Sequence, residues 1–130
     1  MRKDWERATN TGDIAQVCAL IDAGIDINAL DRYGQTALMN AAHKGHIEVV
    51  RVLVEKGANL NHTAKFGLSA LMLAAIADHP QVVQVLVDGG ADASMNGSSR
   101  ATPFFNQTAL KLAEQMGHRQ CAEILKNTKS

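Results

Sequence analysis

The histidines are the side chains of this sequence best suited to chemistry, because five are present and two lie close together in His43-Lys44-Gly45-His46. A zinc site generally requires four ligands drawn from Cys, His, Asp and Glu. Gly45 is expected to end a helix between the two histidines, and no nearby cysteine or carboxylate completes a four-ligand set. We therefore predict no metal site, and we assign His43 to a binding surface.

The two cysteines, Cys18 and Cys121, are candidates for nucleophilic or redox chemistry. A reactive cysteine needs basic neighbours or a helix N-terminus that lowers its pKa. Only Cys121, which follows His118 and Arg119, has such neighbours, and both residues are expected to be buried thiols. No phosphate-binding loop is expected either, because Asp88-Gly89-Gly90 closes a predicted helix. The sequence thus predicts that the chain is not an enzyme and that it binds no cofactor.

Charge and hydropathy exclude two further classes of function. The chain has 13 basic and 13 acidic residues and a pI of about 7.0, whereas a nucleic-acid-binding protein normally carries a basic surplus. No apolar run approaches the ~20 residues that a membrane-spanning helix needs. The first residues are too polar for a signal peptide. We expect a monomeric cytoplasmic protein that binds neither nucleic acid nor membrane.

An internal repeat organises the whole sequence. When residues 31–63 are laid over residues 64–96, 14 of the 33 positions are identical, where chance would give roughly two. The segment Gln107-Thr108-Ala109-Leu110 repeats Gln35-Thr36-Ala37-Leu38 after six additional residues. We therefore predict a single domain over residues 1–130, with repeats at about 1–30, 31–63, 64–96 and 107–128 and a loop insertion at about 95–106.

Each repeat has the signals of a helix, a turn and a second helix. Thr36, Ser69 and Thr108 are suited to cap the first helix, and Gly45 is suited to end it. Asp78 replaces this glycine in the third repeat, and Asp tolerates the left-handed conformation better than most residues. The following Pro80 fits the first turn of the second helix. Because one hairpin cannot bury its apolar face alone, the hairpins must stack, with polar residues on the two end repeats.

This stack keeps the two cysteines apart. Cys18 and Cys121 lie three repeats from each other, which corresponds to roughly 25–30 Å at about 8–10 Å per packed helix. A disulfide requires Cα atoms within about 7 Å. We therefore predict that no intramolecular disulfide forms.

The segment from Asp31 to His46 resembles the ankyrin motif D-x-x-G-x-T-P-L-H-x-A-A-x-x-G-H, with Ala37 and Met39 in place of its Pro and His. Glu48-Val49-Val50 and Gly57-Ala58 continue the match. The chain is identified as a member of the ankyrin repeat family, which implies an all-α solenoid of four helix-turn-helix repeats with polar capping end repeats. The resemblance also implies that the chain is not an enzyme and binds a partner protein through a concave face of loop tips and first helices.

Carried over position by position, the resemblance assigns nine residues of the second and third repeats to this concave face: Arg32, Tyr33, Gln35, His43, Lys44, Lys65, Phe66, Leu68 and Ile76. Four of them are large and apolar and vary between repeats, which favours exposed contact residues over core residues. The alternative is that Phe66 and Leu68 pack loop against loop.

The insertion adds Arg100, Phe104 and Phe105 as candidate partner-binding residues. The two phenylalanines either anchor a partner or fold back over the last hairpin, and the sequence favours neither. We predict a protein-protein interaction module, a small stand-alone adaptor or inhibitor. The alternatives are a nucleic-acid binder using Arg32, Lys44 and Lys65, marked by a steep salt dependence of binding, or a small enzyme with a pocket of buried titratable groups.

Overall fold

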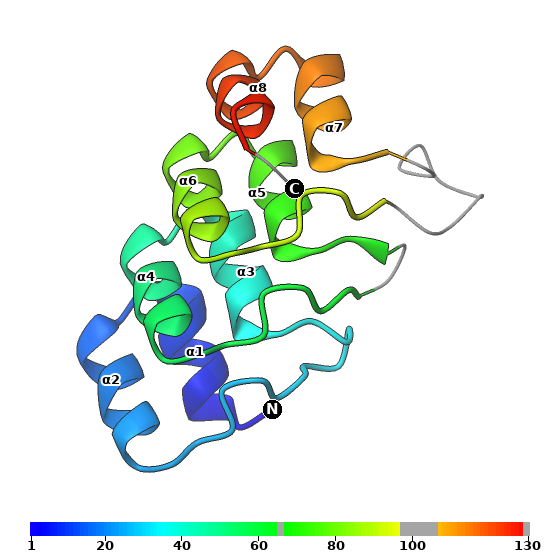
Figure 1. Ribbon diagram of the computed structural model, residues 1–130. Coiled ribbons are helices and arrows are strands. Elements are labelled where there is room, and N and C mark those ends of the chain that lie inside the picture. The colour runs from blue at the N-terminus through cyan, green and yellow to red at the C-terminus, as the bar shows by residue number, and fades with distance from the viewer. Residues whose placement is uncertain (65–66, 97–106, 129–130) are drawn as a thin grey trace.

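The computed structural model describes residues 1–64, 67–96 and 107–128, and its regular structure there is helical. The eight described helices are α1 (Lys3–Thr11), α2 (Ile14–Asp22), α3 (Ala37–Lys44), α4 (Ile47–Glu55), α5 (Ala70–Ile76), α6 (Pro80–Asp88), α7 (Ala109–Met116) and α8 (Arg119–Lys126). Consecutive helices pair as antiparallel hairpins, and the hairpins stack in chain order (Figure 1). The fold is therefore an all-α repeat solenoid.

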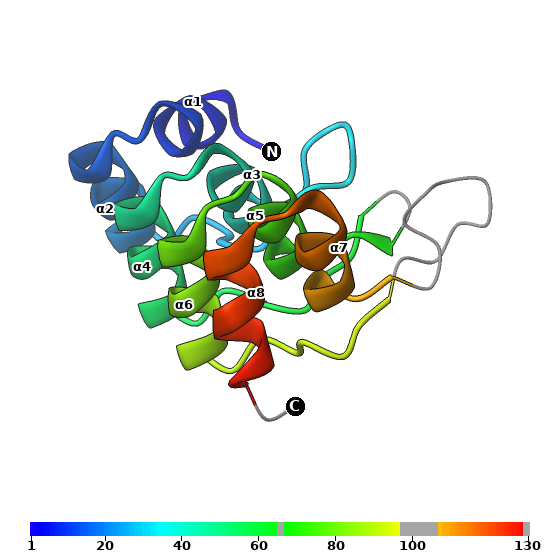
Figure 2. The same ribbon diagram turned by 90° about the horizontal axis from the view of Figure 1, so that it is seen from above.

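The stack has two layers. Helices α1, α3, α5 and α7 form an inner layer, and α2, α4, α6 and α8 form an outer layer, as both ribbon views show (Figures 1 and 2). Each helix contacts its hairpin partner and its counterparts in the neighbouring hairpins. The long connections between hairpins project away from the outer layer (Figure 2). The inner helices and these connections therefore line the side of the molecule on which a partner was expected.

The predicted N-caps are confirmed. The hydroxyl oxygen of Thr36 accepts a hydrogen bond from Met39 N at 3.2 Å, and the hydroxyl of Thr108 accepts one from Lys111 N at 3.2 Å. Ser69 does the same for Met72 N at 3.3 Å. Each hydroxyl satisfies a backbone N–H that has no partner within the helix. Pro80 is the first residue of α6, where its missing N–H costs no helical hydrogen bond.

The turn between the two helices of a hairpin requires a left-handed residue. Gly45 adopts φ 76°, and a Cβ at this position would lie 2.7 Å from the ring of His79. Asp78 occupies the same position in the next hairpin and, as predicted, is left-handed, with φ 60°. It is the only non-glycine residue with positive φ in the part of the chain that the structure describes. An aspartate here is strained relative to glycine, because its Cβ crowds the following carbonyl.

The core lies between the two layers and continues from hairpin to hairpin. Leu38, Val50 and Leu53 are buried in the second hairpin, and their counterparts in the third are buried as well. Trp5 takes the place of Leu38 in the first hairpin and is fully buried. The end hairpins are polar on their outer sides, since Gln16 and Lys126 are exposed where the inner repeats have valine. Polar side chains thus lie at both ends of the stack that the structure describes.

Hydrogen bonds across the layers join neighbouring hairpins. His46 Nε2 lies 2.8 Å from Asn10 O, and His79 Nε2 lies 3.0 Å from His43 O. His118 reaches Ala75 O through Nδ1 at 2.8 Å. Each turn histidine thus satisfies a carbonyl at the end of the preceding inner helix, which gives these three residues a structural role.

A second set of hydrogen bonds joins the loops that follow the outer helices. The side-chain oxygen of Asn28 accepts from Asn59 N at 2.8 Å, and that of Asn61 accepts from Asp92 N at 2.8 Å. These bonds fix the spacing between successive loops, as the histidines fix the spacing between successive turns. The stack therefore presents its loop side as an ordered surface.

Candidate protein-binding surface

The loop before α3 is held in one conformation by Asp31. Asp31 N donates to Gln35 O at 2.9 Å, and Gly34 N donates to Asp31 O at 3.0 Å. The Asp31 carboxylate accepts from Tyr33 N at 2.8 Å, from Gln35 N at 3.0 Å and from Asn40 Nδ2 at 3.1 Å. Burial alone would raise the pKa of Asp31, but these hydrogen bonds outweigh it, so the pKa lies below its ordinary value. The carboxylate is therefore a structural anion that shapes the loop.

The tip of this loop presents Arg32 and Tyr33. Tyr33 is 65% exposed, the largest exposure among the large hydrophobic residues that the structure describes. Arg32 Cζ lies 5.1 Å from the centre of the Tyr33 ring, which is within the range of a cation–π contact. The contact orders two long side chains before any partner arrives, so less conformational entropy is lost on binding. Tyr and Arg are also the residue types that most often dominate protein interfaces.

The other end of α3 presents His43 and Lys44, which are both exposed. The eight residues of α3 span about 12 Å, so this basic end and the Arg32–Tyr33 tip lie on the same hairpin within reach of one partner segment. Gln35 is half-buried beneath the tip, where its backbone closes the turn. The second hairpin therefore brings together four of its five predicted side chains as exposed groups and uses Gln35 for support.

The third and fourth hairpins continue the same face with apolar side chains. Ile76 is half-buried near the end of α5, and Met116 is 44% exposed at the end of α7. The positions that they occupy correspond to His43 and Lys44 of the second hairpin. The face thus changes from basic to apolar along the stack.

The structure corrects the prediction for Leu68. This side chain is only 9% exposed and belongs to the hydrophobic core. Leu68 is therefore a core residue and not an exposed contact residue. Five predicted residues, namely Lys65, Phe66, Arg100, Phe104 and Phe105, lie outside the described residues.

Sequence reasoning missed one exposed apolar residue of this region. Leu30 is 44% exposed and directly precedes the Asp31 turn, and its backbone carbonyl accepts from the N-terminal amine of Met1 at 3.1 Å. The signal was available, because the next repeats have Thr63 and Asn96 at this position. A large apolar residue where the other repeats are polar indicates a role outside the shared core.

The charges are unequally divided between the two sides of the molecule. The outer helices and their flanking turns (13–29, 46–62, 78–96 and 118–128) contain nine acidic and four basic residues of the 13 of each in the chain. Among the other residues that the structure describes, four are acidic and six are basic. The inner side on which Arg32 and Lys44 lie is thus the basic side of a protein whose net charge is zero.

The groups with shifted pKa values do not form a reactive cluster. Cys121 is fully buried in α8, and burial, with a smaller contribution from the charge of Asp78, raises the pKa of its thiol to about 11. The idea that His118 and Arg119 could lower this pKa is therefore wrong. Cys18 in α2 and Cys121 are both free, at opposite ends of the stack (Figure 1). Within the described residues, no group of three or more His, Cys, Asp or Glu side chains could hold a metal ion.

None of the helices that the structure describes is long and apolar enough to cross a membrane. The family model described as ankyrin repeats (3 copies) matches residues 6–97 and 60–130. No curated protein matches the chain. Ankyrin repeats generally mediate binding between proteins, and members of this family are typically not enzymes. Because the matched residues cover almost all of the sequence and the described helices form the stacked hairpins expected of such repeats, the chain belongs to the ankyrin repeat family.

Proposed function

We propose that the protein is a small adaptor or inhibitor that binds one partner protein through its inner face, with each of the four helix pairs acting as one repeat of a single domain over residues 1–130. The observation that carries the proposal is the Arg32–Tyr33 pair, which is stacked, exposed and fixed on an ordered loop. Lys65, Phe66, Arg100, Phe104 and Phe105 are proposed to extend this surface.

The chemistry of the face defines the partner segment. Arg32 and Lys44 favour carboxylates against the second hairpin, whereas Ile76 and Met116 favour apolar side chains against the third and fourth. We therefore propose a segment with acidic residues at one end and aliphatic or aromatic residues at the other. Such a gradient fixes the direction in which the segment binds.

The test begins with partners captured from the native cell by the wild-type protein. Each is then titrated by calorimetry against the wild type, Tyr33→Ala and Lys44→Ala. Loss of the Tyr33 ring should weaken binding about tenfold or more, as for a central interface residue, and loss of Lys44 should weaken it less. Lys56→Ala is the matched control, since Lys56 is an exposed base at the end of outer helix α4. If Tyr33→Ala and Lys44→Ala both bind like the control, the inner face is not the binding site.

A further inference from the structure

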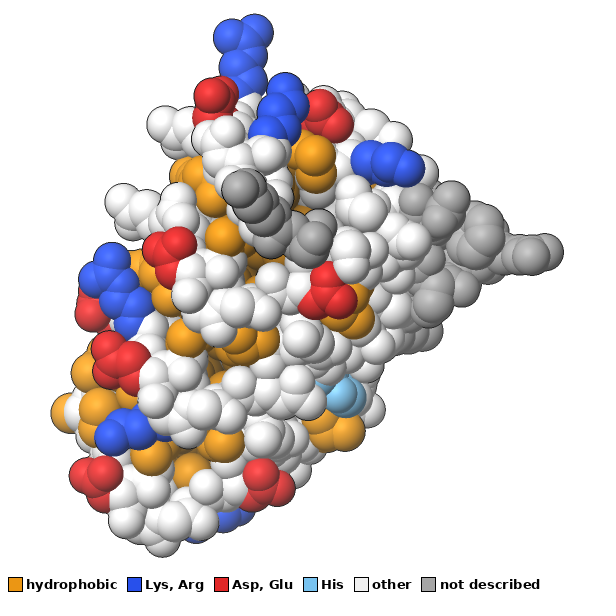
Figure 3. All heavy atoms as spheres, viewed as in Figure 1, with side chains coloured by type: hydrophobic (Ala, Val, Ile, Leu, Met, Phe, Trp, Pro, Cys, Tyr) orange, Lys and Arg blue, Asp and Glu red, His pale blue; other side chains and the backbone are white. Residues whose placement is uncertain are grey.

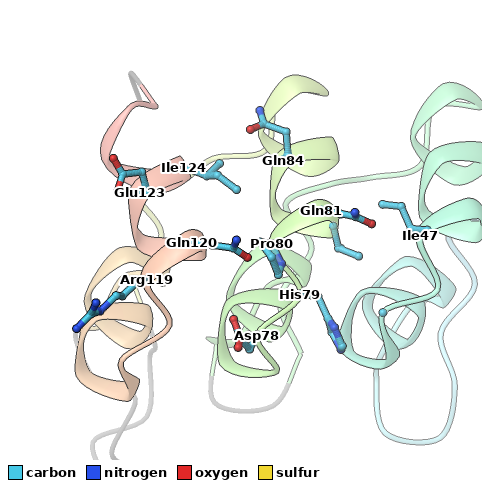
Figure 4. Close-up of a pocket in the computed structure, with 12 residues that line it drawn as sticks. Ile47, Asp78, His79, Pro80, Gln81, Gln84, Arg119, Gln120, Glu123 and Ile124 are labelled. Carbon is cyan, nitrogen blue, oxygen red and sulfur yellow. The ribbon is translucent and has the colours of Figure 1, made fainter.

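The outer layer contains a groove that the inner face does not use. It has a volume of about 630 Å³ and crosses the first turns of α6 and α8 beside the start of α4. Figure 4 shows Gln120 and Ile124 of α8 pointing towards α6, with Pro80 and Gln81 of α6 between them and Ile47 of α4. The groove is therefore lined both by apolar side chains and by polar ones, among them three glutamine amides.

This groove continues along both sides of α6. Two further hollows, of about 530 Å³ and about 380 Å³, lie between α4 and α6 and between α6 and α8. Gln84 lines all three, so they form one surface with α6 as its central ridge. Figure 3 shows hydrophobic side chains in the furrows between the outer helices and carboxylates beside them. We call this surface the outer groove.

The side chains of α6 differ from those of its neighbour in a way that suits a peptide. Gln81 and Gln84 occupy the positions that Glu48 and Arg51 occupy in α4, so no charged side chain lies on α6 before Asp88. A glutamine amide can both donate to and accept from a peptide backbone. Gln84 Nε2 donates to Asp88 Oδ1 at 2.8 Å, which holds the Gln84 amide beside the end of α6. Uncharged amides above an apolar floor are suited to an extended or helical segment of another protein.

The charges around the outer groove are mostly negative. Its lining includes the four carboxylates of Glu55, Asp78, Asp88 and Glu123 but only two guanidiniums, those of Arg51 and Arg119. Arg51 Nη1 also lies 3.5 Å from Glu48 Oε1, which offsets the charge of Arg51.

The end of α6 adds a local conflict to this charge. Asp88 is its last residue and no basic residue lies in its last turn, although a helix C-terminus is itself a negative pole. The outer helices α2 and α4 also end on an acidic residue with no basic residue in the last turn, so this charge pattern recurs along the outer layer, and a cation from a partner would reduce the repulsion at the end of α6.

We infer that the outer groove is a second docking surface, which takes a partner segment bearing Lys or Arg side chains alternating with aliphatic ones. The aliphatic side chains pack between Ile47, Pro80 and Ile124, and the cations lie beside Asp88 and Glu123. The outer groove and the inner face lie on opposite layers, so both can be occupied at once. The protein is then a bridge between two partners of opposite charge, and this second surface does not depend on the first.

The test uses two six-residue peptides with the 15N-labelled protein, one alternating Lys with Leu and a matched one alternating Glu with Leu. The Lys peptide should shift the backbone amide signals of α6 and α8, including those of Gln84 and Ile124, and the Glu peptide should leave them unchanged. The double variant Asp88→Asn/Glu123→Gln should bind the Lys peptide about fivefold more weakly or worse. The side-chain oxygen of the new asparagine can still accept the hydrogen bond from Gln84 Nε2. An unchanged midpoint of thermal unfolding shows that the variant is folded.

Tyr33→Ala is the control that separates this proposal from the binding at the inner face, and it should bind the Lys peptide as the wild type does. The inference is overturned if the shifted signals lie on the inner helices, if no signal shifts, or if the Glu peptide binds the outer groove equally well. It is also overturned if the double variant keeps its affinity for the Lys peptide.

Discussion

Cys121 shows how a single residue is controlled by its neighbours in the stack. Its thiol lies 3.7 Å from an Asp78 carboxylate oxygen, across the boundary between the third and fourth hairpins. Burial and this carboxylate both disfavour the thiolate, which explains the pKa of about 11. We predict that iodoacetamide at pH 8 alkylates the partly exposed Cys18 first and that Cys121 reacts only after urea is added. Peptide mass spectrometry measures both, and equal labelling of the two cysteines in the native protein would count against the burial of Cys121.

The same thiol makes stability depend on pH. An unfolded cysteine has a pKa of about 8.5, so the folded state retains a proton that the unfolded state loses between about pH 8.5 and about pH 11. The stabilising contribution is therefore complete below pH 8.5 and falls as the pH rises through this window. We expect the urea midpoint of the wild type to fall more steeply from pH 8 to pH 10 than that of Cys121→Ala. Parallel curves for the two proteins would contradict the prediction.

Asp78 offers a prediction on backbone strain. Replacing it by glycine removes the cost of a left-handed Cβ, which is about 1–2 kcal/mol, although glycine also loses more backbone entropy on folding. We expect Asp78→Gly to be stabilised by up to about 1 kcal/mol in urea unfolding. The matched change Gly45→Ala should destabilise, because φ is 76° there and the new Cβ would meet the His79 ring at 2.7 Å. If the two variants shift the midpoint in the same direction, the conformation assigned to these turns is wrong.

At the scale of the helices, the burial of a side chain decides how much it contributes to the free energy of unfolding. Leu53 in α4 and Leu86 in α6 are fully buried, so replacing either by alanine should cost about 2–5 kcal/mol through lost contacts and a cavity. Lys126→Ala should cost no more than about 1 kcal/mol, because its 3.8 Å ion pair with Glu114 is exposed. Urea unfolding of the three variants measures the difference. Similar losses in all three would show that the repeat register is misassigned.

The helices were predictable from the sequence because their signals are local. The caps at Thr36, Ser69 and Thr108, the turn at Asp78 and the start of α6 at Pro80 each follow from one residue and its position. Leu68 was wrongly assigned to the exposed concave face, because variation between repeats does not show which way a side chain points. Its counterpart Gln35 is half-buried, whereas Leu68 is only 9% exposed. The outer groove depends on how far α4, α6 and α8 stand apart, which no single repeat encodes.

At the scale of the whole molecule, stability is not uniform along the stack. The first hairpin has only one neighbour, and α2 packs against α4 less extensively than the later outer helices pack against each other. In a linear stack, each unit is stabilised by its own contacts and by those of its neighbours. We therefore predict that the amides of α1 and α2 exchange with deuterium faster than those of α3 to α6. Exchange at one common rate in all of these helices would indicate that the molecule unfolds only as a whole.

The division of charge between the two layers has a consequence for the approach of any partner. A molecule with no net charge lacks the attraction that a net charge would exert on an ion, yet its separated charges give it a dipole moment, on which the field of a charged partner exerts a torque. The basic inner side would thus turn towards an acidic segment, and the acidic outer side towards a basic one, before the surfaces touch. Salt should slow both encounters, because it screens charges that lie further apart than one Debye length, which is ~8 Å at physiological ionic strength. This salt dependence is expected although the protein itself has a formal charge of +0.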